Sequence, residues 1–82
     1  MHKEEKKKNE ISANTFNNEI IFDIISLYTT RLAETPEDTA VLTRLAYAYE
    51  ALGEHNREMI VWKRIYSIDS GHKEAKRKLN VK

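Results

Sequence analysis

Apolar residues in this chain recur at a constant offset of 34 positions, which leaves few architectures open to it. Tyr28 and Trp62 are separated by 62 − 28 = 34 residues. The same offset relates Leu32 to Tyr66, Ile25 to Met59, Pro36 to Ser70, Val41 to Ala75 and Leu45 to Leu79. Because apolar positions and a turn share one period, the sequence indicates a single supersecondary unit that is used more than once.

Within this period, apolar residues return every three or four positions, as they do on one face of an α-helix. The first stripe, in a helix expected over 16–34, contains Ile21, Ile24, Ile25, Tyr28 and Leu32. Its β-branched residues would also suit a strand, but a stripe that persists for more than three turns favours a helix. Similar stripes predict a helix over 37–52, a third from 56 to 68 and a short closing helix around 75–79.

Turn-forming residues separate these helices. Pro36 disfavours a helical residue before it, so the first helix should end near Glu34, and Thr35 is expected to cap the second helix. Gly53 suits the left-handed conformation that commonly follows a helix, and Asp69-Ser70-Gly71 ends the third one. Since the connections are short, neighbouring helices should be antiparallel.

A helix–turn–helix unit of 34 residues is the period of the tetratricopeptide repeat, and the stretch 39–72 resembles one. The match lies in Leu45-Ala46, Tyr49, Gly53, the aromatic Trp62 and the acidic Asp69 before the break. In that family, the leucine and the small residue let the paired helices approach closely, and the aromatic residues fill the space between them. The turn before this stretch resembles the end of a preceding, degenerate repeat, because it contains the family's closing proline.

The sequence departs from the repeat pattern at three positions. Glu58 stands where the family usually has alanine, close to the contact between the helices. Ile65 replaces another small residue, and Ser70 stands where proline is common. A generic helical bundle is therefore the alternative to a repeat.

We expect an all-α fold of antiparallel helix–turn–helix repeats, with about one and a half repeats and a C-terminal capping helix. A single domain should span 16–82, because a chain of 82 residues has room for no second core. Residues 1–15 are rich in lysine, glutamate and asparagine and lack apolar periodicity. We expect this segment to be a polar tail, either disordered or a frayed helix.

Nothing in the sequence predicts catalysis. The chain has no cysteine, and His2, His55 and His72 do not pair on a helical face at a spacing of four. The sequence also lacks metal-binding, phosphate-loop and nucleophile motifs. We therefore expect neither enzymatic activity nor a bound metal or cofactor.

The formal net charge is only +1, but it is unevenly distributed. Lysines dominate 3–8, acidic residues dominate the middle of the chain, and basic residues return in 73–82. Nucleic-acid binders usually carry a net positive excess, so nucleic acid is an unfavoured partner; a small nucleic-acid-associated protein that uses the basic ends is the alternative function. No apolar run could span a bilayer and no secretory-signal core is present, so we expect no membrane contact and a cytoplasmic location.

The resemblance implies where a partner protein would bind. In tetratricopeptide proteins the first helix of each pair lines a concave surface that holds a segment of another protein. On the second and last helices, we expect this surface to contain Thr43, Arg44, Tyr47, Glu50, Lys73, Arg77 and Lys78. Tyrosine and arginine are favoured at binding hot spots, and the basic side chains predict an acidic partner segment, either extended or helical.

The number of repeats bears on association. Stacked repeats bury their core through their neighbours, and about three are usually needed for a stable array. With about one and a half, the chain should either close its own core or leave an apolar face for a second copy or another protein. The sequence thus predicts a protein-interaction adaptor that can form homo-oligomers; the end of a larger repeat array is the remaining alternative.

Overall fold

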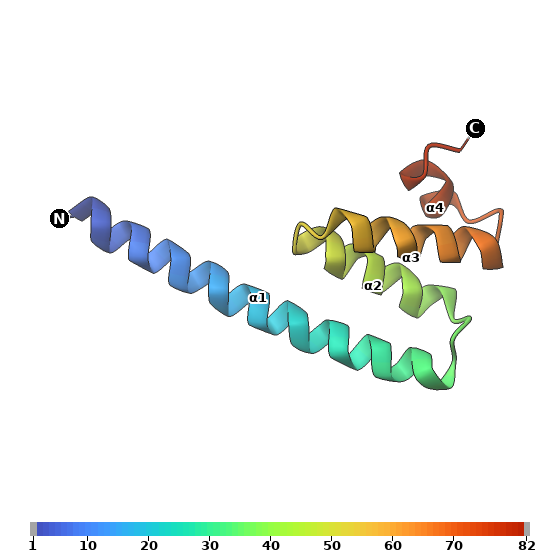
Figure 1. Cartoon of the computed structure of the whole chain (residues 1–82), viewed down its shortest axis with the longest axis horizontal. Coiled ribbons are helices and arrows are strands. Elements are labelled where there is room, and N and C mark those ends of the chain that lie inside the picture. Colours follow the sequence, from blue (N-terminus) through green and yellow to red (C-terminus); the bar gives the residue numbers. More distant parts are fainter. Residues whose placement is uncertain (1, 82) are drawn as a thin grey trace.

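Four helices form the fold in the computed structural model, which describes residues 2–81 and, for side chains, residues 18–81. They are α1 (His2–Glu34), α2 (Thr39–Ala51), α3 (His55–Ile68) and α4 (Lys73–Lys78). The part of the chain that is described contains no strand. Helix α2 packs between α1 and α3, and α4 packs on α3 (Figure 1). The all-α fold of antiparallel helical hairpins is therefore confirmed.

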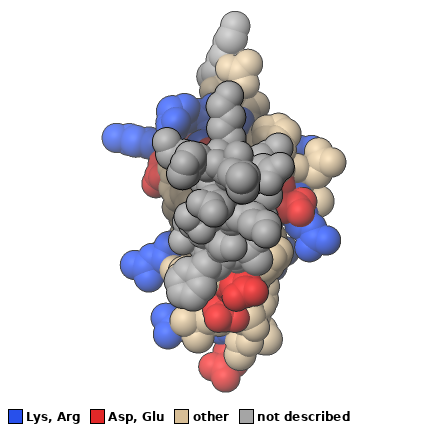
Figure 2. Space-filling model, turned by 90° about the vertical axis from the view of Figure 1, so that its left-hand side faces the viewer, with Lys and Arg blue, Asp and Glu red and all other residues tan. Residues whose placement is uncertain are grey.

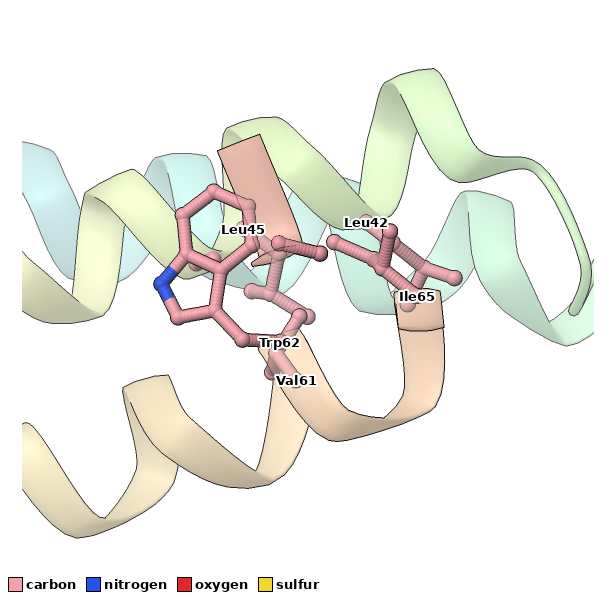
Figure 3. Close-up of a cluster of buried hydrophobic side chains, with 7 residues drawn as sticks. Leu42, Leu45, Val61, Trp62 and Ile65 are labelled. Atoms are coloured by element: carbon pink, nitrogen blue, oxygen red, sulfur yellow. The ribbon is translucent and has the colours of Figure 1, made fainter. Parts of the chain in front are cut away.

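The core lies between α2 and α3 and is completed by α4. Leu42 and Leu45 of α2 face Trp62 and Ile65 of α3, and Trp62 and Ile65 are fully buried (Figure 3). Two alanines, one in α2 and one in α4, are also fully buried, at Ala46 and Ala75. A methyl side chain at these positions lets neighbouring helices approach closely, and each large apolar side chain that is fully buried contributes about 1.5–3 kcal/mol of transfer free energy.

Helix α1 contacts this core with one face only. Ile25, Tyr28 and Leu32 are partly buried against the core, whereas the N-terminal part of α1 extends past the other helices (Figure 1). The helix begins at His2 rather than near Phe16, and the segment before Phe16 contains good helix formers and neither glycine nor proline. Side chains before Asn18 lie outside the described residues, so the prediction that 1–15 form a polar tail stays a prediction.

The turn between α1 and α2 corrects one expectation. α1 ends at Glu34 as predicted, but the N-cap of α2 is Asp38 and not Thr35. The Asp38 carboxylate accepts hydrogen bonds from the amides of Ala40 and Val41, at 3.1 and 3.2 Å. Thr35 instead donates its hydroxyl back to the carbonyl of Arg31. An acidic side chain at this position also suits the positive end of the helix dipole.

Two left-handed residues end α2 and α4. Gly53 has φ of 75° after α2, and its amide and that of Glu54 bond to the carbonyls of Glu50 and Tyr49. This paired arrangement satisfies the free carbonyls at the end of α2, as predicted for Gly53. Asn80, with φ of 60°, has the corresponding place after α4, where the amide of Val81 bonds to Lys76.

Among the helices described, none combines the length and the apolar character that a bilayer-spanning segment needs.

Candidate partner-binding surface

The residues predicted to bind a partner lie on α2 and α4, and contacts between side chains connect these two helices. Thr43, Arg44, Tyr47 and Glu50 belong to α2, and Lys73, Arg77 and Lys78 belong to α4. Hydrogen bonds and an ion pair between side chains cross from one helix to the other. We call the surface formed by these seven residues the α2–α4 surface.

Tyr47 lies at the centre of the α2–α4 surface and is half-buried. Its ring packs edge-on against Trp62, with 5.3 Å between ring centroids, so the core orients it. Its hydroxyl donates to Glu74 at 2.5 Å and accepts from Arg77 at 3.4 Å. The hydrogen bond to Glu74 and, to a lesser extent, burial and the negative charge of Glu74 raise the pKa of Tyr47 above its ordinary value of 10.0.

Lys78 connects the same surface to Glu58, a buried residue in the first turn of α3. Its ammonium group forms an ion pair with Glu50, lies 3.7 Å from the Glu58 carboxylate and 5.4 Å from the centre of the Tyr47 ring. The hydrogen bond with Glu50 raises the pKa of Lys78 and lowers that of Glu50. Glu50 and Lys78 therefore neutralise each other, and this contact holds α4 against α2.

Glu58 is the buried acidic residue of the core, with 5% of its surface exposed. Its carboxylate accepts a hydrogen bond of 2.9 Å from the indole nitrogen of Trp62, one turn later in α3. The Lys78 ammonium lies on one side, and the imidazole of His55 lies 3.6 Å away on the other. Glu58 thus lies next to the helix–helix contact, as expected. Its carboxylate is stabilised there by one hydrogen-bond donor and two basic groups.

His72 belongs to this site, although the sequence analysis assigned it no role. It is the N-cap of α4, and its Nδ1 accepts a hydrogen bond from the amide of Ala75 at 3.2 Å. Its Nε2 lies 3.3 Å from the hydroxyl of Thr43, which itself donates to the carbonyl of Thr39. The neutral tautomer with its proton on Nε2 satisfies both contacts, because Nε2 then donates to Thr43.

Arg44 and Lys73 differ from the other predicted residues, because they form no hydrogen bond or ion pair with the side chains described at 18–81. Both are exposed, on α2 and α4 respectively. The α2–α4 surface carries four cations against Glu50 and the adjacent Glu74, which gives a formal charge of 4 − 2 = +2. The structure thus brings together Tyr47, Glu50, Arg77 and Lys78 through mutual contacts, joins Thr43 to α4 through His72, and leaves two cations open to solvent.

A second feature is a shallow hollow beside α1. It has a volume of about 160 Å³ and is lined by apolar side chains from α1 and α2, with polar ones from the start of α3: Phe22, Ile25, Tyr49, Leu52, Glu54 and Arg57. Phe22 is 58% exposed, so one wall of the hollow is an aromatic ring in contact with water. The sequence stripe did not include Phe22, which lies on α1 about 90° from the face that packs on the core.

The described residues offer little for other chemistry. They contain no group of three or more histidine, cysteine, aspartate or glutamate side chains that could hold a metal ion. On the end of the molecule from which α1 projects, basic side chains stand at separate places with acidic ones between them (Figure 2). A continuous basic patch, which a nucleic-acid phosphate backbone would require, is absent from the described part of this face.

No protein-family model, curated protein or solved structure matches the chain.

Proposed function

We propose that the protein is an interaction module that binds an acidic segment of a partner protein across the α2–α4 surface. The observation that carries the proposal is the Tyr47 side chain, whose hydroxyl accepts a hydrogen bond from Arg77, on a surface whose other cations Arg44 and Lys73 are exposed. An aromatic surface with forked and point-like donors at its edge is the usual composition of a binding hot spot.

Preorganisation supports this proposal. Tyr47 is held by Trp62 and Glu74, and Lys78 is held by Glu50, so little side-chain entropy remains to be lost on binding. Binding therefore has to order only the exposed cationic side chains, and a partner segment that bears carboxylates supplies their counter-charges. The resemblance to tetratricopeptide repeats, in which the corresponding helices hold partner segments, points to the same surface.

The test uses synthetic acidic peptides, extended and helical, titrated against the full chain by fluorescence anisotropy. Reversing the exposed charges in Arg44→Glu and Lys73→Glu should weaken binding about tenfold or more, which is about 1.4 kcal/mol per factor of ten. Neither side chain contributes to the described internal contacts, so both variants should unfold at the parent's temperature. Lys63→Glu, an equal charge change at an exposed position of α3, is the matched control and should leave affinity unchanged.

Alanine at Tyr47 tests the aromatic part of the surface. Binding that is unchanged in Tyr47→Ala and in Arg44→Ala would refute the proposed surface. Binding of a mixed-sequence DNA duplex with a steep salt dependence, in the absence of peptide binding, would favour the nucleic-acid alternative instead.

A further inference from the structure

The α2–α4 surface has a carboxylate of its own chain at its aromatic centre. Glu74 is the only acidic residue of α4, whose other charged residues are all lysine or arginine. Its carboxylate accepts the hydrogen bond that Tyr47 donates at 2.5 Å, and Arg77 donates to the same hydroxyl at 3.4 Å. A tyrosine hydroxyl has a single O–H to donate. In the free protein, the donor of Tyr47 is therefore already used.

The stability of α4 explains a negative charge at position 74 but not this contact. An acidic residue in the first turn suits the positive end of the helix dipole wherever its carboxylate points. Tyr47 and Glu74 are 27 residues apart, so their hydrogen bond forms only when α4 is docked beside α2. Glu74 is half-buried, and its carboxylate gives up part of its hydration to make this contact. A hydrogen bond to an ionised acceptor is strong enough to offset that cost.

The contact between Tyr47 and Glu74 has two opposite effects on partner binding. It helps to order the tyrosine, but it also occupies the hydroxyl. The ordering effect is the smaller one, because Trp62 already packs edge-on against the ring, with 5.3 Å between centroids. Occupancy lowers the apparent affinity in proportion to the fraction of molecules whose hydroxyl is free. A hydroxyl that is free in about one molecule in ten lowers the apparent affinity about tenfold.

We infer that Glu74 is an internal competitor: its carboxylate occupies the Tyr47 hydroxyl in the free protein, and an acidic partner segment binds by displacing it. The inference rests on the proposed function, because it assigns a regulation of the same surface. Displacement exchanges one carboxylate for another, so Tyr47 and Arg77 keep an equivalent hydrogen-bond partner while Glu74 returns to water. A segment whose further carboxylates reach the exposed Arg44 and Lys73 displaces Glu74, whereas an isolated carboxylate does not.

The first test asks, without any partner, whether the contact forms in solution. The chain has four tyrosines, so subtracting the ultraviolet titration of the matching Tyr47→Phe protein isolates Tyr47. The hydrogen bond to Glu74 and the charge of Glu74 raise the pKa of Tyr47, and Glu74→Gln removes that charge. Tyr47 should therefore titrate at lower pH in Glu74→Gln than in the parent. Identical titration of Tyr47 in the two proteins would overturn the inference.

The second test titrates a labelled oligoglutamate peptide against the full chain by fluorescence anisotropy. Glu74→Gln, which removes the competing charge, should bind the peptide about fivefold to tenfold more tightly than the parent. Glu74→Asp keeps the charge, but its side chain is one methylene shorter and withdraws the carboxylate from Tyr47. It should also bind more tightly, which a purely electrostatic role of Glu74 does not predict.

A charge change elsewhere on the chain is the matched control. Glu19→Gln alters an exposed position of α1, which packs only on α2 among the described helices, and it should bind the peptide like the parent. Far-UV circular dichroism and the fluorescence of Trp62 verify that each variant is folded.

A double-mutant cycle isolates the competition. In Tyr47→Phe no hydroxyl remains to be occupied, so adding Glu74→Asp should leave the affinity unchanged. The same gain in both backgrounds, or no gain from either Glu74 variant while the parent binds, would overturn this inference and leave the proposed function standing. Absence of peptide binding by the parent and by every variant would overturn both.

Discussion

The buried hydrogen bond between Glu58 and Trp62 yields a prediction in which this structure and the repeat pattern disagree. Tetratricopeptide repeats usually have alanine at the place that Glu58 occupies in this chain. The resemblance alone therefore predicts that Glu58→Ala is harmless. In this structure, Trp62 is fully buried and its indole nitrogen donates to Glu58 at 2.9 Å. Alanine would leave that N–H group buried without an acceptor, which costs about 1–3 kcal/mol.

We therefore expect Glu58→Ala to lower the free energy of unfolding by about 2 kcal/mol. For a domain of this size, that loss lowers the melting temperature by about 8–16 °C. The assay is urea unfolding followed by far-UV circular dichroism and by the fluorescence of Trp62, which is the single tryptophan. The midpoint should fall while the dependence on urea concentration stays unchanged.

Two further variants separate the hydrogen bond from the charge. Glu58→Gln keeps an oxygen acceptor for Trp62 and should lose less stability than Glu58→Ala. A double-mutant cycle of Glu58→Ala with Trp62→Phe, followed by circular dichroism, should give a coupling free energy of about 1.5–3 kcal/mol. A Glu58→Ala protein as stable as the parent, or more stable, would refute the reasoning and show that Glu58 is only tolerated in the core.

Three other predictions concern the helix ends and the α2–α4 surface. His72→Ala should lower thermal stability by about 1 kcal/mol through loss of the α4 N-cap, whereas His72→Asn, which keeps an acceptor, should cost less. Gly53→Ala should cost about 1 kcal/mol in urea unfolding, because φ is 75° and no atom lies within 4 Å of the added methyl; Gly71→Ala, without a positive φ, should cost less. Tyr47 and Lys78 both have a raised pKa, so the stability that they contribute is complete below their ordinary values of 10.0 and 10.5 and is lost as pH rises through the higher folded values. Urea midpoints between pH 9 and 12 should therefore fall less steeply in Tyr47→Phe than in the parent.

The helices and most of the core could be predicted from the sequence, because their signals are local or periodic. The stripe that contains Leu45 follows the helical period, and Gly53 marks a left-handed position that few other residues adopt. These features depend on neighbours three to five residues away. The single-helix contact of Glu58 with Trp62 has the same range, and its spacing of four residues was the signal that could have revealed it.

The features that the sequence could not predict depend on contacts between distant residues, or on which of two equally suitable residues takes a role. Thr35 and Asp38 are both good capping residues, and only the path of the turn selects Asp38. His72 and Thr43 are 29 residues apart, so their contact requires α4 to be docked near α2. The start of α1 at His2 was also missed, because a polar helix has no apolar periodicity to detect.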